Sequence, residues 1–358
     1  MNGRDETAAA LEALCASVGL PDARVRASAE RALDAKTKPR RSLGRIESLA
    51  ADIAAIRGST DLGDFRPVVV VAAGDHGVAI EGVSAYPQVV TQQMVANIAG
   101  GGAAISVLAR EFGARLVVVD AGTLAPVVHP GAVDARVRAG TGNIAVEPAM
   151  RHGEAIALVL HGAALARELA AEGCNLIALG EMGIANTTVA SALASAYLHL
   201  DPDVVTGTGT GIDSDARRRK VEVIRRALAI ANPADAEPVA TLAMLGGCEI
   251  AYLAGVAVGA AAARIPVLLD GFISTAAALV ATRLAPSVGD SLIASHCSQE
   301  PGHVVVLEAL GLRALVDLEL RLGEGSGAAL CIPLVRAALA LLADMATFSA
   351  VGVTDTGA

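Results

Sequence analysis

Short apolar runs rich in Val, Leu and Ile recur through the middle of the chain, and each is followed by glycine and polar residues and then by a longer stretch with helical spacing. The apolar residues in these runs are nearly continuous, which is typical of parallel strands buried on both faces of a sheet. Strands that alternate with helices predict an α/β fold, in which helices cover both faces of a mostly parallel sheet. The predicted strands are 68–71, 116–119, 176–179, 266–269, 291–294 and 315–320.

A polar cluster follows each predicted strand. In sheets of this kind, ligands bind outside the carboxyl ends of the strands. We expect all six clusters along that edge, where they can form one site although they are far apart in the sequence. The clusters are 74–77, 120–122, 180–183, 270–271, 295–296 and 323–325.

The start of the chain has helical spacing, with charges interleaved, over residues 8–57. Ser42 is the expected N-cap of the second helical stretch, with Arg45 at the position where a capping box would have Glu. Residues 36–45 carry five cations and no aromatic residue. We expect this segment to be a solvated linker, with an anion contact as the alternative.

The end of the chain, residues 333–348, is predicted to be a strongly apolar helix with no strand after it. The simplest arrangement pairs this helix with the N-terminal helices. The prediction is a small helical domain of residues 1–60 and 333–358 beside a large catalytic domain of residues 61–332. The 358 residues, 53% of them apolar and 18% charged, are sufficient for both cores.

The composition of the chain indicates which partners it can bind and in which compartment it folds. The net charge of −9 repels phosphate backbones, and 2% aromatic residues leave few platforms for stacking bases, so nucleic acid is excluded as a partner. The five cysteines form no CxxC pair, which favours a reducing compartment, the cytoplasm, over a disulfide framework or a thiolate metal site. The N-terminus lacks the basic-then-apolar order of a signal peptide.

A membrane span is considered only for residues 250–263, which carry no charge. Spanning a bilayer takes about 20 apolar residues. Glu249 and Arg264 close this shorter run on both sides. Its Ala and Gly content predicts a helix packed closely inside the core, and no contact with a membrane.

The sharpest candidate for chemistry is Glu324, which lies between Gly323 and Gly325 directly after the last predicted strand. Glycines on both sides allow a ligand to approach the backbone closely. A single carboxylate in that position suits a catalytic base. The alternative is a solvated carboxylate in the first turn of a helix, where the helix dipole favours it.

Residues 180–188, Gly-Glu-Met-Gly-Ile-Ala-Asn-Thr-Thr, follow a predicted strand and open a predicted helix. The free backbone N–H groups at a helix start, together with the hydroxyls of Thr187 and Thr188, make an anion site for a phosphate. An ordinary Asn or Thr N-cap is the alternative. Two glycines and three polar side chains exceed what a cap requires, so we favour the phosphate.

Residues 206–211, Thr-Gly-Thr-Gly-Thr-Gly, lack both the Gly-Lys-Ser/Thr of a P-loop and the final glycine of a dinucleotide fingerprint. They fit a flexible loop over the site. A helix expected to begin near Asp213 or Ser214 carries four cations at 217–220. Most should be solvated, and one that faces inward could neutralise a substrate phosphate.

Three histidines, His76, His296 and His303, lie in separate loops, and no pair has the helix-face spacing of metal ligands. We expect hydrogen-bonded structural histidines and no metal. Residues 81–88 and 91–94 combine an aromatic, a methionine and neutral hydrogen-bonding groups, which suits a flat heteroaromatic ligand. The alternative is a turn before a helix whose methionine belongs to the core.

Together these clusters indicate a phosphate subsite, a flat apolar subsite and one carboxylate, with no cofactor fingerprint. Group transfer at a sugar carbon fits that set. From about residue 37 to 353, the chain also resembles the nicotinate-nucleotide:dimethylbenzimidazole phosphoribosyltransferases of cobalamin nucleotide-loop assembly. The motifs that carry the resemblance are 38–39, 42–44, 74–77, 82–87, 180–184, 186–188, 207–209, 270–272, 295–296, 300–303, 321–329 and 345–348.

The resemblance implies that nicotinate mononucleotide and 5,6-dimethylbenzimidazole give α-ribazole 5′-phosphate and nicotinate. It further implies a Rossmann-like large domain, a small helical domain that joins both chain ends, a homodimer, and neither metal nor cofactor. Glu324 matches the general base that takes the benzimidazole proton, and Glu181 matches a second carboxylate near the reacting ring or sugar. The phosphate region is matched by Gly183, Asn186, Thr187, Thr188 and Lys220, and the base pocket by Ser84, Tyr86, Gln92 or Gln93, and Leu322.

Burial against apolar neighbours such as Leu322 is expected to raise the pKa of Glu324, as a base that holds a proton requires. Two residues depart from the family pattern, Ala185 in place of a glycine and Cys297 in the Ser-His segment. The alternatives left open are a phosphoribosyltransferase or hydrolase that acts on another nucleotide or azole, and a nucleotide sensor without enzyme activity.

Overall fold

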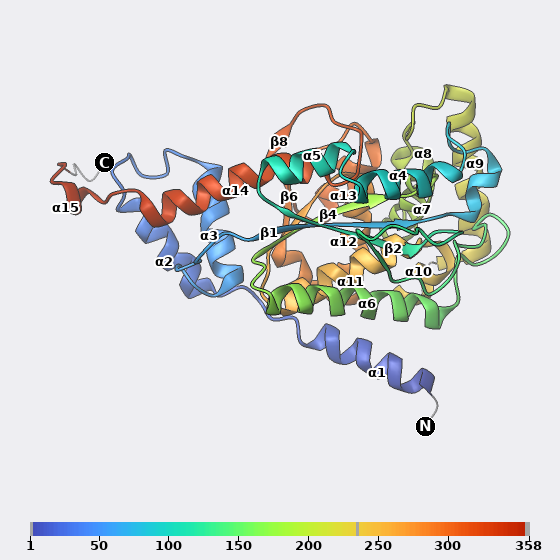
Figure 1. The fold of residues 1–358 in the computed structure, drawn as a ribbon, viewed down its shortest axis with the longest axis horizontal. Helices are drawn as coiled ribbons and strands as arrows, with labels where there is room; N and C mark the ends of the chain where they lie inside the picture. The colour runs from blue at the N-terminus through green and yellow to red at the C-terminus, as the bar shows by residue number, and fades with distance from the viewer. Residues whose placement is uncertain (1–2, 234–235, 355–358) are drawn as a thin grey trace.

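A six-stranded parallel sheet forms the centre of the molecule (Figure 1). The computed structural model describes residues 3–233 and 236–354. The strand order β3-β2-β1-β4-β5-β6 is that of doubly wound α/β folds, which confirms the predicted fold class. The strands are β1 (Pro67–Gly74), β2 (Arg115–Gly122), β3 (Ala132–Asp134), β4 (Leu176–Met182), β5 (Val267–Leu269) and β6 (Leu292–Ala294).

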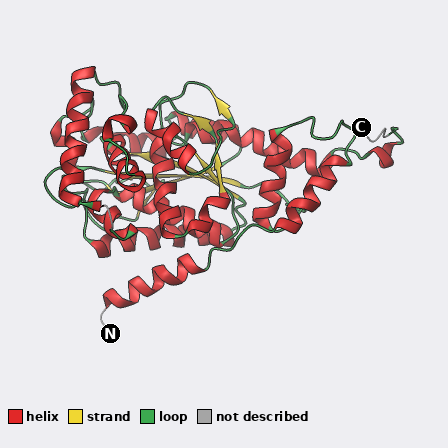
Figure 2. Ribbon diagram, turned by 180° about the vertical axis from the view of Figure 1, so that it is seen from behind, coloured by secondary structure: helices red, strands yellow, loops and turns green. Residues whose placement is uncertain are grey.

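Helices cover both faces of the sheet, as Figures 1 and 2 show. The α-helices are α1 (Gly3–Ala16), α2 (Ala23–Asp34), α3 (Arg45–Arg57), α4 (Val89–Ala99), α5 (Ala104–Glu111), α6 (His152–Ala171), α7 (Asn186–Leu198), α8 (Pro202–Val205), α9 (Ser214–Ala231), α10 (Pro238–Leu245), α11 (Cys248–Ala262), α12 (Phe272–Leu284), α13 (Pro301–Ala309), α14 (Ser326–Asp344) and α15 (Phe348–Val351). Within the described residues, 3₁₀ helices include η1 (Gly77–Glu81) and η3 (Pro286–Ser291).

The central strand β1 is buried at every position, which explains its nearly continuous apolar sequence. Val68 and Val70 face the layer that contains α6, α11 and α12, whereas Val69 and Val71 face the layer that contains α3, α5 and α14. Alternate residues of one strand thus contribute to two separate cores.

The predicted strand at 315–320 is wrong in length and place. Only β8 (Val316–Asp317) forms there, and it pairs with β7 (His296–Cys297) in a separate two-stranded sheet. Leu318 is exposed and Glu319 has a φ of 57°, so the chain leaves the extended conformation at once. The short strand β3 was not predicted, since its three residues, two of them exposed, form no apolar run.

Chain segments from both ends lie side by side at one end of the molecule (Figure 1). α2 packs on α3, and α14 contacts both, while Lys36 and Thr347 form an antiparallel bridge. α1 packs instead against α6 and α11, and α14 crosses residue 333 as one continuous helix. The division at residues 60/61 and 332/333 stays a prediction.

The solvated linker predicted at 36–45 is wrong in part, because two of its lysines are buried. Lys36 Nζ donates to the carbonyl of Met345 at 2.6 Å, and Lys38 Nζ lies 2.8 Å from a carboxylate oxygen of Glu47. The predicted cap is wrong as well. α3 begins at Arg45 after Gly44, so Ser42 lies outside the cap position.

The last long helix, α14, begins at Ser326 and contains Pro333, so it starts earlier than predicted. Among the described residues it is the one helix long and apolar enough to cross a membrane, but half of that stretch is buried and it packs against α3, α5 and β4. Burial of this kind is typical of a core helix. The charge-free run at 250–263 forms most of α11, which is buried along its length, as predicted.

The helices α6 and α11 pack closely through glycines. A Cβ on Gly255 would lie 1.9 Å from the carbonyl oxygen of Val159, and one on Gly162 would lie 2.0 Å from that of Tyr252. Gly255→Ala is therefore expected to lower the free energy of unfolding by about 1–3 kcal/mol. Gly153→Ala in α6, where a Cβ meets nothing within 4 Å, is the control and should be neutral or stabilising. Chemical denaturation measures both, and equal stabilities would contradict the predicted clash.

Candidate active site

A cavity of about 430 Å³ opens at the carboxyl edge of the sheet. It lies where β4 and β5 end, beside the loop that precedes α14. Seven of the residues predicted for the site line it: Glu324, Glu181, Gly183, Asn186, Thr187, Tyr86 and Leu322.

The loop that carries Glu324 has an unusual backbone. Gly323, Glu324 and Gly325 have φ angles of 86°, 65° and 90°, so all three are left-handed. For a residue with a Cβ this conformation costs roughly 1–2 kcal/mol. The carboxylate of Asp270, at the end of β5, holds the strained loop by accepting hydrogen bonds from the N–H groups of Gly325, Gly327 and Ala328 at 3.1, 2.7 and 3.0 Å.

The end of β4 brings Glu181 against the same loop. Glu181 pairs with Ala72 of β1, at the carboxyl edge. A Cβ on Gly323 would lie 2.4 Å from Oε1 of Glu181, and one on Gly180 would lie 2.4 Å from the carbonyl oxygen of Glu324. Both glycines are thus required for the two segments to meet, and the structure brings the two predicted carboxylates into one cavity wall.

Both carboxyl groups are buried, and burial raises the pKa of each. The pKa of Glu324 rises through burial and the nearby charge of Asp270, against a hydrogen bond from the N–H of Ile105 at the start of α5. Burial, with the charge of Asp270, raises the pKa of Glu181 to about 8, although the Asn186 amide opposes the shift. With a pKa of about 8, Glu181 holds a proton at neutral pH.

Glu324 itself is 5% exposed, so the alternative of a solvated first-turn carboxylate does not hold. The cause of its burial differs from the expected one, because Leu322 is 57% exposed. Its carboxylate is instead covered by the start of α5, where it accepts the hydrogen bond from Ile105 at 3.4 Å. A helix N-terminus stabilises the ionised form, which a base needs before it takes a proton.

The predicted phosphate region contains one buried cation. Lys220 of α9 is fully buried, and its Nζ donates to Oγ1 of Thr187 at 2.7 Å. Burial lowers the pKa of Lys220 to about 8, against the charge of Glu300. Asn186 donates to Glu181, and no side chain caps α7, so the alternative of an ordinary N-cap does not hold.

The glycine-rich segment 206–211 lies over this region. A Cβ on Gly209 would lie 2.8 Å from Oγ1 of Thr187 and 3.2 Å from Nζ of Lys220. The N–H of Gly209 donates to Oε1 of Glu300 at 2.8 Å, and Oγ1 of Thr210 accepts from the N–H of Ala85 at 3.0 Å. The segment therefore connects the α7 end of the cavity to the segment that contains Tyr86.

The remaining predicted residues lie outside the cavity lining. Ser84 contacts Thr210 through its hydroxyl at 3.3 Å, and Gln92 donates to the carbonyl of Pro126 at 3.1 Å. Gln93 is exposed, and the Thr188 hydroxyl is buried inside α7. The apolar wall of the cavity is formed by Tyr86, Val90, Met94, Ile184, Phe272, Ile273 and Leu322.

The histidines are hydrogen-bonded, as predicted. His76 lies 2.8 Å from Glu249, and both are fully buried. His303 lies 3.0 Å from the Thr275 hydroxyl and accepts from the N–H of Ser298 at 2.9 Å. Within residues 3–233 and 236–354, no group of three or more His, Cys, Asp or Glu side chains is arranged to hold a metal ion.

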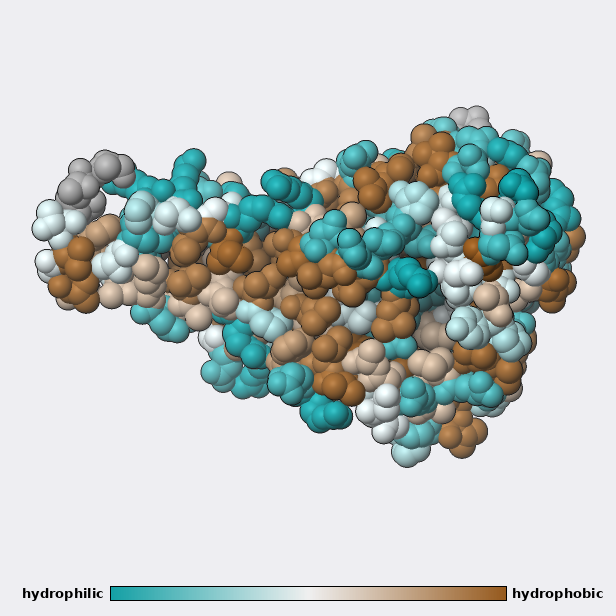
Figure 3. Space-filling model, turned by 90° about the horizontal axis from the view of Figure 1, so that it is seen from above, coloured by the Kyte–Doolittle hydropathy of each residue, from teal (hydrophilic) through white to brown (hydrophobic). Residues whose placement is uncertain are grey.

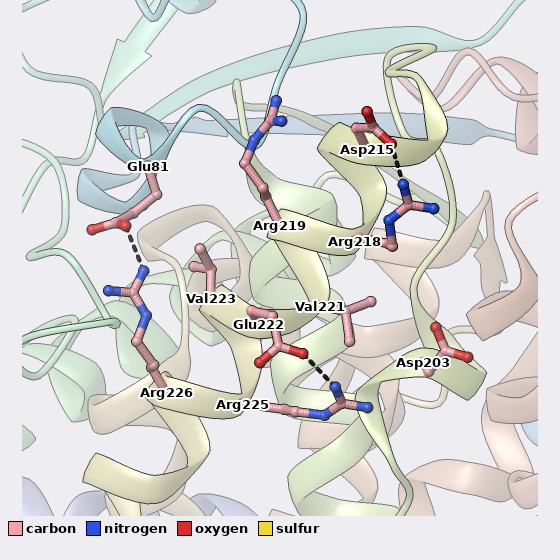
Figure 4. A pocket seen from close by; sticks show the side chains of 10 residues that line it. All are labelled: Glu81, Asp203, Asp215, Arg218, Arg219, Val221, Glu222, Val223, Arg225 and Arg226. Atoms are coloured by element: carbon pink, nitrogen blue, oxygen red, sulfur yellow. Dashed lines mark hydrogen bonds and ion pairs between the residues drawn. The ribbon is translucent and has the colours of Figure 1, made fainter.

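A second hollow of about 700 Å³ lies along α9 and contains none of the predicted site residues (Figure 4). Three ion pairs lie between residues that line it. Arg226 lies 2.6 Å from Glu81, Arg225 lies 2.5 Å from Glu222, and Arg218 pairs with Asp215. These arginines form the solvated face that the sequence predicts for α9, whereas Lys220 is its inward cation.

The fold and the site have known relatives. The family model described as phosphoribosyltransferase matches residues 18–353. Nicotinate-nucleotide-dimethylbenzimidazole phosphoribosyltransferase from Halalkalibacterium halodurans is 47% identical over 338 residues, which covers 94% of this chain and 95% of the relative. The protein of that name from Cupriavidus necator is 49% identical over 334 residues, which covers 93% and 96%. The crystal structure of that phosphoribosyltransferase from Thermus thermophilus matches with a TM-score of 0.88 and 46% identity, covering 93% of this chain and 99% of that one.

The chain belongs to the nicotinate-nucleotide-dimethylbenzimidazole phosphoribosyltransferase family. Membership confirms the resemblance inferred from the motifs. Membership also makes the departure at Ala185 informative, because this residue has a φ of 75° at the start of α7. A left-handed position favours glycine, the residue expected there from the family pattern, so this chain accepts backbone strain beside the predicted phosphate region.

Several residues that line the cavity or hold the loops around it were not predicted as site residues. Asp270 holds the Glu324 loop, Glu300 holds Gly209, and Arg321 lies at the start of the loop. All three residues stand in motifs that carry the resemblance, so these motifs could have marked them as site residues. Their roles depend on contacts between distant segments, which spacing alone does not give.

Proposed function

We propose that this chain transfers the phosphoribosyl group of nicotinate mononucleotide to 5,6-dimethylbenzimidazole, in the lower-ligand branch of cobalamin biosynthesis. The observation that carries the proposal is the meeting of Glu324 and Glu181 in one cavity wall, with Thr187 at another part of the cavity and the buried Lys220 behind it. The cavity thus combines a hydroxyl backed by a cation for a phosphate, carboxyls beside a reacting sugar, and an apolar wall for a flat acceptor. Family membership gives the reaction itself.

Glu324 is the proposed general base. It takes the N–H proton of the benzimidazole as the other ring nitrogen attacks C1′ of the ribose. The bond from C1′ to the nicotinate nitrogen breaks, and its electron pair returns to the pyridine ring. Because this neutralises the ring charge, the leaving group needs no proton, and the chemistry draws on no metal or cofactor. Positioning of the acceptor and removal of one proton are then the main tasks of the protein.

The proposed partners are the two small substrates and a second copy of the chain, in the cytoplasm. All five cysteines are free thiols, which suits a reducing compartment. Exposed apolar side chains support a homodimer, and apolar residues gather across the middle of the face seen in Figure 3. Exposed large apolar side chains include Val89 on α4, Val107 on α5, and Leu318 and Leu322 near the Glu324 loop.

The test is a product assay with nicotinate mononucleotide and 5,6-dimethylbenzimidazole, in which chromatography follows free nicotinate and the ribotide. Equal formation of both products is expected. Nicotinate released without ribotide would instead indicate a hydrolase. No turnover with any azole, together with retained nucleotide binding, would indicate a sensor. Sedimentation of the purified chain tests the dimer separately.

A further inference from the structure

The charged side chains of the cavity are unevenly distributed. Arg321 is the one Arg or Lys among the described lining residues, and within the described chain its guanidinium forms no hydrogen bond or ion pair. Burial lowers the pKa of the lining His296, which favours its neutral form. The acidic side chains of the lining are three carboxyls, Glu181, Glu300 and Glu324, and the phenol of Tyr86.

Arg321 lies beside Gly211, whereas Thr187 and Lys220 lie beside Gly209 of the same segment. It precedes the Glu324 loop, and its guanidinium is 4.0 Å from the Cβ position of Gly211, at the far end of segment 206–211. The buried cation at the phosphate region is Lys220, which lies behind Thr187. A phosphate held there leaves Arg321 without an anionic partner.

The proposed donor carries a second anion, the carboxylate on its pyridine ring. The ionised carboxyls of the cavity disfavour that charge except beside a cation, and Glu181, whose pKa is about 8, adds no charge at neutral pH. A guanidinium offers a planar pair of N–H donors that matches a carboxylate, and it pairs poorly with a neutral amide. We infer that Arg321 binds the ring carboxylate and so selects the acid form of the mononucleotide over the amide form. The inference rests on the proposed function.

The experiment measures the binding of nicotinate mononucleotide and nicotinamide mononucleotide to the wild type and to Arg321→Gln by calorimetry. The variant is expected to bind the acid form about 10-fold more weakly and the amide form as before, because only the acid offers an ionic hydrogen bond. Arg321→Lys should recover part of the selectivity. The control is Arg218→Gln, since Arg218 is exposed and pairs only with Asp215 on α9.

The ratio of the two affinities separates recognition from a general disturbance of the loop, because a distorted loop weakens both ligands. An unchanged ratio in Arg321→Gln would overturn the inference. If Arg321→Gln weakens both nucleotides equally but binds nicotinate riboside as the wild type does, Arg321 contacts the phosphate and the inference is also overturned. Failure of the proposed function is a different result, namely wild type that forms no ribotide from the acid form.

Discussion

Glu324→Gln is expected to lower kcat by about 10²- to 10⁴-fold, the usual contribution of a general base, while substrate binding is retained. The amide keeps the size and the hydrogen-bond acceptor of the carboxylate but takes no proton. The Asp270 carboxylate that holds the loop bonds to backbone N–H groups, so the loop should keep its conformation. Steady-state kinetics and calorimetry on the same preparation measure both quantities. Glu308→Gln, at an exposed position of α13, is the matched control.

The pH dependence distinguishes Glu324 from Glu181. A base works when deprotonated, so kcat/KM should rise with pH through the pKa of Glu324, which burial places above the ordinary value. This rise should be lost in Glu324→Gln. A rise with a midpoint near 8 that persists in the variant would instead assign the base to Glu181, whose pKa is about 8. Retention of full kcat in the variant would contradict the proposed mechanism.

The parallel sheet could be predicted because burial on both faces leaves a direct record in the sequence. Strand β1 is apolar at nearly every position for that reason. The same rule failed at 315–320, where the apolar residues alternate with Asp317 and Glu319 and only two residues form β8. Alternation of this kind indicates one exposed face, so it should have argued against a strand in the central sheet.

The site was predictable where a local motif carries the chemistry, and not where a distant segment completes it. Glu181 and Glu324 stand beside glycines, and Gly180 and Gly323 are explained by the contact between the two segments. The role of Asp270 depends on three N–H groups that follow it by more than fifty residues in the chain. Lys36 and Lys38 show the same limit, because a charged segment is expected to be solvated until its partners at Met345 and Glu47 are known.

Lys220→Met is expected to weaken binding of nicotinate mononucleotide by about 10²- to 10³-fold, since losing one partner of a buried hydrogen-bonded charge pair costs roughly 2–5 kcal/mol. The ammonium is fully buried behind Thr187, so water does not replace it. Calorimetry with the nucleotide measures the loss. Arg219→Met, one position earlier on the exposed face of α9, should bind as the wild type does (Figure 4). Nicotinate riboside, which lacks the phosphate, should bind the wild type and Lys220→Met equally.

Because burial lowers the pKa of Lys220, binding of the nucleotide should also depend on pH. In the free protein the lysine is charged below about pH 8 and neutral above it. A phosphate dianion favours the charged form, so above that pH binding must be accompanied by uptake of a proton. The affinity of the wild type should therefore fall as pH rises through about 8, by up to tenfold per pH unit for a single proton. Lys220→Met should lack this dependence. If the variant retains it, the titrating group is another one, and Glu181, whose pKa is also about 8, is the first to test.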